Sequence, residues 1–377
     1  MKPKIILTVI AAIAGIVAMS QSDLKLKLDS IANLGIEQGI PGIQILISKK
    51  GQSDYHNYGF QDIYQTSTIN DSTIWRYGSI TKLLTTVVIL QLESEGKLNT
   101  ADCITNHLDM KFHTDDSITI KHLLNHTSGL YNYTSDWHLS KKRMRKKKHA
   151  NISMQQCAEY GLKRKLNFEP GSLHKYCNTG FVILGLIIEE ITQKSIYENF
   201  QDRIFIPCGL SSMTYPLDEK VPDNTARGYI KKRKKYIDYT EIHHGWANSA
   251  GAVFGTANDL LKFNQSIFDG TLLDSTQLNK MISPTIIFRD LDAEGKEWYY
   301  HAIGMGFFLN LNQSGKSVYI SHGGNTLGYN CNIHYNLEND MTIIVGMNLF
   351  PNGNYEPVFH IQNELIDLIH KYYKRNE

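Results

Sequence analysis

Cysteine is scarce in this chain of 377 residues, and its five copies form no recognisable set. They occupy positions 103, 157, 177, 208 and 331, an odd number with no C-x-x-C pair among them. The spacing therefore predicts neither a disulfide framework nor a zinc site. His122 and His126 stand four residues apart, but no third ligand candidate accompanies them, so we expect no metal.

Long apolar runs are also missing, with one exception at the start of the chain. Residues 5–19 are apolar behind a basic start, and this run is shorter than the roughly 20 residues that a membrane-spanning helix needs. Small residues follow it, which is typical of a secretory signal cut after Ser20. We predict a signal peptide over residues 1–20, no stable membrane span after its removal, and a periplasmic or secreted protein. An uncleaved anchor is the alternative.

An excess of charge of one sign is absent too. Removing residues 1–20 takes away two of the 39 basic residues and none of the 37 acidic ones, so 37 of each remain. This balance argues against a dedicated nucleic-acid binder, which needs excess cationic charge. Cations still concentrate in Lys141–Lys148 and in Lys231–Lys235. The simpler interpretation is a solvated surface, and the alternative is contact with an anionic envelope polymer, above all through Lys141–Lys148.

The hydrophobic pattern predicts the order helix, strands, helical insertion, strands, helix. Helices are expected over 23–39, 81–95, 181–193 and 358–373, and strands over 42–48, 55–60, 304–310, 317–322, 330–335 and 341–348. The predicted fold class is α+β: an antiparallel sheet flanked by N- and C-terminal helices, with an inserted mostly helical lobe. We expect one domain over 21–377, with its α/β part at about 21–78 and 246–377 and its helical lobe at about 79–245.

Several common site motifs are missing. The chain has no G-x-S-x-G elbow, no H-E-x-x-H, no P-loop and no G-x-G-x-x-G. These absences remove support for a metal or nucleotide cofactor, and we expect none.

A Ser-x-x-Lys tetrad, Ser79 to Lys82, lies where a loop marked by Gly78 leads into a predicted helix. Three residues of helix place both side chains on one face. A serine hydroxyl becomes a good nucleophile when a neighbouring base takes its proton, and a lysine serves as that base when burial lowers its pKa. The tetrad also begins at Ser22, Ser94 and Ser172, so its place at a helix start distinguishes the copy at 79.

Two later motifs add polar groups of the kinds that such a serine needs. Tyr176 and Asn178 precede the next strongly apolar helix, where a phenol could exchange protons and an amide could hold a substrate carbonyl. Residues 321–325 read Ser-His-Gly-Gly-Asn at the end of a predicted strand, and their glycines let a substrate backbone come close. His322 could bind a carboxylate or tune the tyrosine.

The ordered set of Ser-x-x-Lys, Tyr-x-Asn and His-Gly-Gly resembles the serine beta-lactamase and penicillin-binding enzyme family, in its class C-like branch with the D,D-carboxypeptidases and related esterases. The resemblance covers about residues 25–370. Four further segments resemble its connecting signatures: His-Thr-Ser-Gly-Leu at 126–130, Phe-Glu-Pro-Gly at 168–171, Ser-Ala-Gly at 249–251 and Thr-Ala-Asn-Asp-Leu at 256–260. The fold that it implies is beta-lactamase/transpeptidase-like.

The resemblance implies a role for each motif residue. Ser79 would be the acylated nucleophile, Lys82 would accept its proton, and Tyr176 would relay that proton to the leaving group. Asn178 would orient the acyl amide. The backbone N–H groups of Ser79 and Asn325 would form the oxyanion hole.

The third motif departs from the pattern of the class C beta-lactamases. They usually have Lys-Thr-Gly where this chain has His322, Gly323 and Gly324, which we expect to bind substrate together with Asn178 and Asn325. A titratable histidine in place of a fixed positive charge weakens the antibiotic-hydrolase interpretation. We expect His126 and Ser128 to be structural, in a turn that supports the cleft.

The predicted function is therefore a serine hydrolase that works through an acyl-enzyme on a small-molecule or peptide substrate. D-alanyl peptides of the cell wall, such as peptidoglycan stem peptides, are the leading substrate class. Other amides or esters, and beta-lactams, are the alternatives. A catalytically silent protein that senses penicillins or wall fragments is a further alternative from another functional class.

Overall fold

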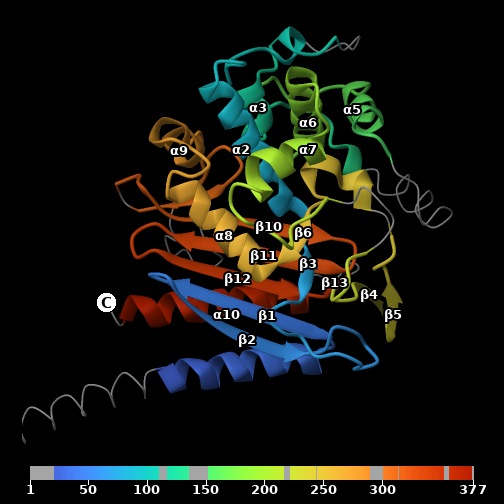
Figure 1. Cartoon of the computed structure of the whole chain (residues 1–377), viewed down its shortest axis with the longest axis vertical. Helices are drawn as coiled ribbons and strands as arrows, with labels where there is room; N and C mark the ends of the chain where they lie inside the picture. The colour runs from blue at the N-terminus through green and yellow to red at the C-terminus, as the bar shows by residue number, and fades with distance from the viewer. Residues whose placement is uncertain are drawn as a thin grey trace, which may run out of the picture.

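The computed structural model describes residues 21–109, 117–135, 152–215, 221–242, 244–288, 300–312, 314–351 and 356–375. The predicted signal segment and the basic stretch Lys141–Lys148 lie outside these ranges. An antiparallel sheet fills the middle of the described chain, with a group of helices above it and two helices at its lower side (Figure 1).

The main sheet has the strand order β2-β1-β12-β11-β10-β9-β8-β7, and each neighbouring pair is antiparallel. Its strands are β1 Gly42–Lys49, β2 Gln52–Gly59, β7 Ile286–Phe288, β8 Tyr300–Ile303, β9 Phe308–Leu311, β10 Ser317–Thr326, β11 Tyr329–Asn336 and β12 Met341–Met347. The first and last parts of the chain thus share one sheet, because β1 pairs with both β2 and β12. The antiparallel sheet predicted from the sequence is confirmed.

One face of the sheet is covered by the N- and C-terminal helices, as the sequence predicts. Residues 21–37 are helical, and α10 spans Glu356–Arg375. Alternate residues of β1, Ile43, Ile45 and Ile47, form one buried cluster with side chains of both helices. Because the other face is covered too, nearly all of β1 is buried.

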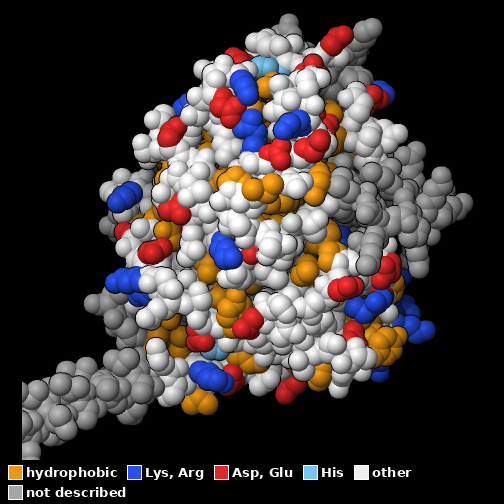
Figure 2. Space-filling view, viewed as in Figure 1, with side chains coloured by type: hydrophobic (Ala, Val, Ile, Leu, Met, Phe, Trp, Pro, Cys, Tyr) orange, Lys and Arg blue, Asp and Glu red, His pale blue; other side chains and the backbone are white. Residues whose placement is uncertain are grey.

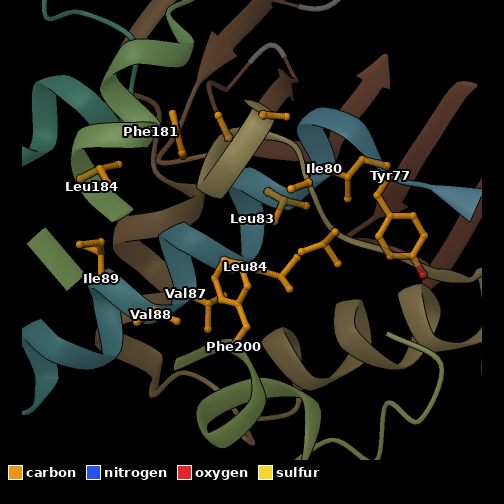
Figure 3. Close-up of a cluster of buried hydrophobic side chains, with 14 of the residues drawn as sticks. Tyr77, Ile80, Leu83, Leu84, Val87, Val88, Ile89, Phe181, Leu184 and Phe200 are labelled. Atoms are coloured by element: carbon orange, nitrogen blue, oxygen red, sulfur yellow. The ribbon is translucent and has the colours of Figure 1, made fainter. Parts of the chain in front are cut away.

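The opposite face supports the helical lobe. Its helices are α2 Thr81–Ser94, α3 Ile120–Leu124, α5 Met154–Leu162, α6 Asn178–Thr192 and α7 Ile196–Phe200, followed by α8 Ala257–Phe268 and α9 Ser275–Ile282. The α2 helix is buried along most of its length, and α6 is mostly buried beside it. Figure 3 shows buried side chains of α2, among them Leu83, Leu84 and Ile89, in the cluster that also contains Phe181 and Leu184 of α6. This packing fixes the start of each helix.

Two short sheets complete the described chain. β3 Ile74–Arg76 pairs with β6 Phe254–Thr256, and β13 Leu349–Pro351, β4 Tyr229–Lys232 and β5 Lys235–Asp238 form the other. β4 and β5 lie within the stretch that the sequence predicts to be mostly helical. The basic run Lys231–Lys235 covers the end of β4, the turn and the start of β5. Arg233 lies in that turn with a φ of 57°.

The predicted strand over 304–310 is wrong in detail, since a turn interrupts it. β8 ends at Ile303 and β9 begins at Phe308, so residues 304–307 connect two paired strands. Gly306 has a φ of 83°, a conformation that favours glycine, and a Cβ there would lie 2.6 Å from Thr86 Oγ1. The first four residues of the predicted strand are thus a turn, in which Met305 and Phe307 alternate with glycines as they would in a strand.

Acidic and basic side chains of the described residues are interspersed on the face seen in Figure 2. None of the helices in the described ranges combines the length and the hydropathy that crossing a bilayer requires.

Candidate active site

Ser79 lies on a single turn of 3-10 helix, Gly78–Ile80, that joins β3 to α2. Gly78 makes this turn possible because its φ is 53°, and because a Cβ there would lie only 3.0 Å from the backbone nitrogen of Asn325. Ile80 is buried, which anchors the turn in the core, while Ser79 stays partly exposed. The sequence prediction of a serine at a helix start is thus close to the observed geometry.

Lys82 is fully buried on the first turn of α2. Its Nζ lies 3.2 Å from Ser79 Oγ and donates hydrogen bonds to Asn178 Oδ1 at 2.7 Å and to the Ala250 carbonyl at 2.6 Å. No acidic side chain of the described residues forms a salt bridge with it. Burial lowers the pKa of Lys82 well below its ordinary value of 10.5, although Cys177 opposes the shift.

Tyr176 and Asn178 join this pair from a segment about a hundred residues away. The ring of Tyr176 lies 4.9 Å from Lys82 Nζ, and its hydroxyl is covered by protein. Burial raises the pKa of Tyr176, and the neighbouring Ser79 side chain partly offsets that rise. Asn178 accepts from Lys82 and donates to Thr134 Oγ1 at 2.9 Å, so its amide is held from both ends.

The third motif lies on β10, which contacts the turn that carries Ser79. Gly324 permits this approach, because a Cβ there would lie 1.7 Å from the Tyr77 carbonyl oxygen. Asn325 is exposed, and its side chain accepts a hydrogen bond from Asn330 Nδ2 at 2.7 Å. The structure therefore places the backbone of Asn325 next to the backbone of Gly78, one residue before the serine.

His322 occupies a different environment from these glycines. It is 1% exposed, and its Nδ1 donates to the Gly323 carbonyl at 2.8 Å. Burial and the Lys82 charge lower the pKa of His322 to about 3, so it is neutral at ordinary pH. Its Nε2 is covered and has no hydrogen-bond partner among the described residues. The substrate contacts expected of His322 and Gly323 stay predictions, since neither lines the cavity described next.

A cavity of about 180 Å³ opens beside Ser79. Of the described residues that line it, none is acidic or basic; they are Gly78, Ser79, Tyr133, Thr134, Asn178, Trp246, Ala247, Ala250, Gly251, Asn325 and Thr326. Tyr133 and Trp246 form its aromatic part and are tied together, because the Tyr133 hydroxyl donates to the Trp246 carbonyl at 2.9 Å. A larger cavity of about 760 Å³, between residues 21–25, the β1–β2 hairpin and Tyr373, contains none of Ser79, Lys82, Tyr176, Asn178 and residues 321–325.

The sequence alone did not reveal four residues of this site. The sequence marks Ala250 only as part of a connecting signature, whereas in the structure its carbonyl accepts a hydrogen bond from Lys82. Thr134, Tyr133 and Trp246 carry no sequence signal at all. Their roles depend on where the chain folds back, which no local pattern reports.

The arrangement suits acyl transfer. A buried amine with no acidic partner among the described residues faces a serine hydroxyl, a phenol lies next to both, and two backbone segments meet beside the serine. These are the parts that nucleophilic catalysis with oxyanion stabilisation needs.

Comparisons with known proteins agree with this chemistry. The Beta-lactamase family model matches residues 22–367. Protein flp of Staphylococcus aureus strain MW2 is 26% identical over 364 residues, which is 93% of this chain and 68% of that protein. A D-aminopeptidase of Brucella anthropi is 27% identical over 331 residues, covering 86% of this chain and 59% of the relative.

A solved structure shares the fold. The D-amino acid amidase of Ochrobactrum anthropi SV3, in its complex with D-phenylalanine, superimposes with a TM-score of 0.79 at 22% identity, covering 94% of this chain and all of that one. Because the family model spans nearly the whole described chain and the three motifs meet in one place, this protein belongs to the Beta-lactamase family and is a serine hydrolase.

Proposed function

We propose that this protein hydrolyses amide bonds of small D-amino-acid derivatives through an acyl-enzyme on Ser79. One observation carries the proposal: the buried amine of Lys82 lies 3.2 Å from the Ser79 hydroxyl, with no acidic partner among the described residues to hold it charged.

Lys82 acts as the general base. A neutral amine has two N–H groups and one lone pair. Asn178 Oδ1 and the Ala250 carbonyl only accept, so they take the two N–H groups. The lone pair is then left for the Ser79 hydroxyl, which donates its proton as its oxygen attacks the substrate carbonyl carbon.

Tyr176 acts as the acid for the leaving group. As the tetrahedral intermediate collapses, the C–N bond breaks and the departing nitrogen takes the proton of the Tyr176 hydroxyl. The Lys82 ammonium returns its proton to the tyrosine, so charge balances and an amine leaves. Water then attacks the carbonyl carbon of the ester on Ser79. The same groups accept a proton from the water and return one to the serine oxygen, which releases the carboxylic acid and restores Ser79.

The developing oxyanion is stabilised by the backbone N–H groups of Ser79 and Asn325. Support comes from the two glycines, Gly78 and Gly324, which bring these backbone segments close together. Fixed donors in a largely buried site need no reorganisation during the reaction.

The substrate class rests on the cavity and on the relatives. A volume of about 180 Å³ is below the roughly 300–1,000 Å³ of pockets that hold drug-sized ligands, which favours a small acyl group. The neutral, partly aromatic lining suits an uncharged or aromatic side chain. The related proteins named a D-aminopeptidase and a D-amino acid amidase make the D-configuration our choice.

Mass spectrometry of the intact protein tests the proposal. We expect the wild type to hydrolyse D-phenylalaninamide and to be labelled by a fluorophosphonate. The Ser79→Ala variant should lose both the hydrolysis and the label. Ser94→Ala is the matched control, because Ser94 begins the same tetrad at the exposed far end of α2. Turnover confined to D-alanyl peptides, esters or beta-lactams would move the substrate assignment to that class. Reversible binding without label or turnover would make the protein a sensor.

We also propose that the enzyme works outside the cytoplasm, as a periplasmic or secreted protein. The apolar run 5–19 behind a basic start supports export. The mature protein recovered from the producing cells should begin at Gln21, and N-terminal sequencing checks this. A chain that retains residues 1–20 would overturn cleavage.

A further inference from the structure

The segment that carries Tyr176 is held by one turn of the chain. We name residues 126–130 the His126 turn and residues 167–177 the tyrosine segment. Backbone N–H groups of the tyrosine segment donate to carbonyls of the His126 turn at three places: Lys175 to His126 at 3.0 Å, Gly171 to Thr127 at 2.8 Å and Asn167 to Gly129 at 2.7 Å. The His126 turn therefore sets the path of the chain that leads to Tyr176.

The side chain of His126 completes this contact at the tyrosine itself. Its Nδ1 accepts a hydrogen bond from the Cys177 backbone N–H at 3.2 Å, and its ring centroid lies 4.4 Å from that of Tyr176. The ring also packs 5.2 Å from Phe181. His126 is 3% exposed, so the imidazole is enclosed between the tyrosine and the start of α6.

His126 adopts a left-handed backbone conformation to do this. Its φ is 60°, a value that is uncommon outside glycine and that asparagine, aspartate and histidine adopt more often than other residues. Such conformations persist where surrounding contacts over-determine them, and they concentrate at functional sites. Burial, Lys82, His174 and His322 all lower the pKa of His126, so the ring stays neutral and Nδ1 stays an acceptor.

We infer that His126 is a positioning residue that holds the Tyr176 phenol where it can protonate the leaving group. This inference rests on the proposed function, in which Tyr176 supplies that proton. His126 touches neither Ser79 nor Lys82 through any hydrogen bond described for it, so its effect on the reaction passes through the tyrosine.

The leaving group separates this role from a merely structural one. An amide nitrogen must receive a proton as it departs, whereas p-nitrophenolate leaves as an anion. Losing the orientation of Tyr176 should therefore slow amide cleavage and spare cleavage of an activated ester with the same acyl group. A loosened fold would slow both.

The experiment compares D-phenylalaninamide with D-phenylalanine p-nitrophenyl ester. For His126→Ala we expect kcat/KM on the amide to fall about 100-fold, within the range typical of general acid catalysis, with KM little changed and the ester reduced less than about threefold. His126→Asn should recover much of the amide activity, because asparagine tolerates the backbone conformation and offers an acceptor oxygen. His126→Phe, which keeps the ring but not the acceptor, should behave like the Ala variant and replaces it if that variant does not fold.

His122→Ala is the matched control. His122 belongs to the same stretch of chain and its ring lies beside Gly171, but its side-chain hydrogen bond to Thr119 caps α3 and is not made to Tyr176 or Cys177. Its loss should lower stability without changing the ratio of amide to ester activity. Equal losses on both substrates in the His126 variants, or no recovery with asparagine, would overturn the inference. If the wild type cleaves esters only, an ethyl ester replaces the amide, since its alkoxide also needs a proton. Turnover that survives Ser79→Ala would instead refute the proposed function.

Discussion

Lys82 is the residue whose surroundings change its chemistry most. An exposed lysine is protonated at neutral pH and cannot accept a proton. Burial disfavours the charged form, so the pKa of Lys82 falls well below 10.5 and the neutral amine becomes available at lower pH. The same burial that costs folding free energy therefore creates the base.

The pH dependence of activity follows from this shift. Protonated Lys82 is inactive, so kcat/KM should rise with pH as Lys82 loses its proton, and it should level off well below pH 10.5. Initial rates on the amide across pH 4 to 11 check this. His322, with a pKa of about 3, should add no inflection to the pH profile of kcat/KM between pH 5 and 8. His322→Asn should leave the shape of the profile in this pH range unchanged. Activity confined to pH above 10.5 would contradict the role of Lys82.

Single residues of the site were predictable where a motif marked them. Ser79 and Lys82 share a tetrad that local chemistry explains, and Tyr176 with Asn178 opens a clearly apolar helix. The carbonyl of Ala250 and the hydroxyl of Thr134 were not predictable, because each acts through one atom that most residues in that place could supply.

At the scale of elements, the approach of β10 to the turn before α2 shapes the site. Gly324 faces the Tyr77 carbonyl with no room for a side chain, whereas a Cβ on Gly323 would lie 3.4 Å from the Asn332 side chain, an ordinary contact. Close packing therefore requires glycine at position 324 but leaves room for a methyl group at position 323.

A pair of alanine substitutions tests this difference. Gly324→Ala should push β10 away from the turn, lower kcat by about 100-fold through the oxyanion donors, and cost about 1–3 kcal/mol in the free energy of unfolding. Gly323→Ala should stay near the wild type in both. Steady-state kinetics and urea unfolding measure the two effects, and equal behaviour of the pair would remove the argument from close approach.

The order of elements was largely predictable, but their ends and pairings were not. Apolar periodicity locates α2, α6, α10 and the strands β1, β10, β11 and β12, since each buries a face over several turns or pleats. β4 and β5 escaped prediction because their run of five cations hides a strand pattern of only four residues each. The turn at 304–307 was predicted as strand because Met305 and Phe307 alternate with glycines.

At the scale of the whole molecule, the described residues form two hydrophobic clusters that relate differently to the site. One lies between the sheet, the helix at residues 21–37 and α10, and the other fills the lobe around α2 and α6. The first stabilises the sheet from behind. The second directly surrounds the helix whose start carries Ser79.

Matched leucine substitutions should separate these clusters. Leu365 of α10 and Leu84 of α2 are both 0% exposed. Each change to alanine should lower the free energy of unfolding by about 2–5 kcal/mol. We expect Leu365→Ala to keep kcat/KM at temperatures where it is folded and Leu84→Ala to lose activity as well. Denaturant unfolding combined with kinetics measures both, and similar activity losses would contradict the separation.

The sequence by itself determined the elements and the chemical groups. Periodicity of apolar residues reports burial along one segment, and the three motifs report which functional groups the chain carries. Only the tertiary structure decided which groups meet. The hydrogen bonds of Lys82 to Asn178 and Ala250 cross 96 and 168 residues of chain, and Tyr133, Thr134 and Trp246 of the cavity lining lie in segments that no motif marks. Such contacts arise from packing between distant segments. They form because the whole folded core has the lower free energy, which no local stretch of sequence reports.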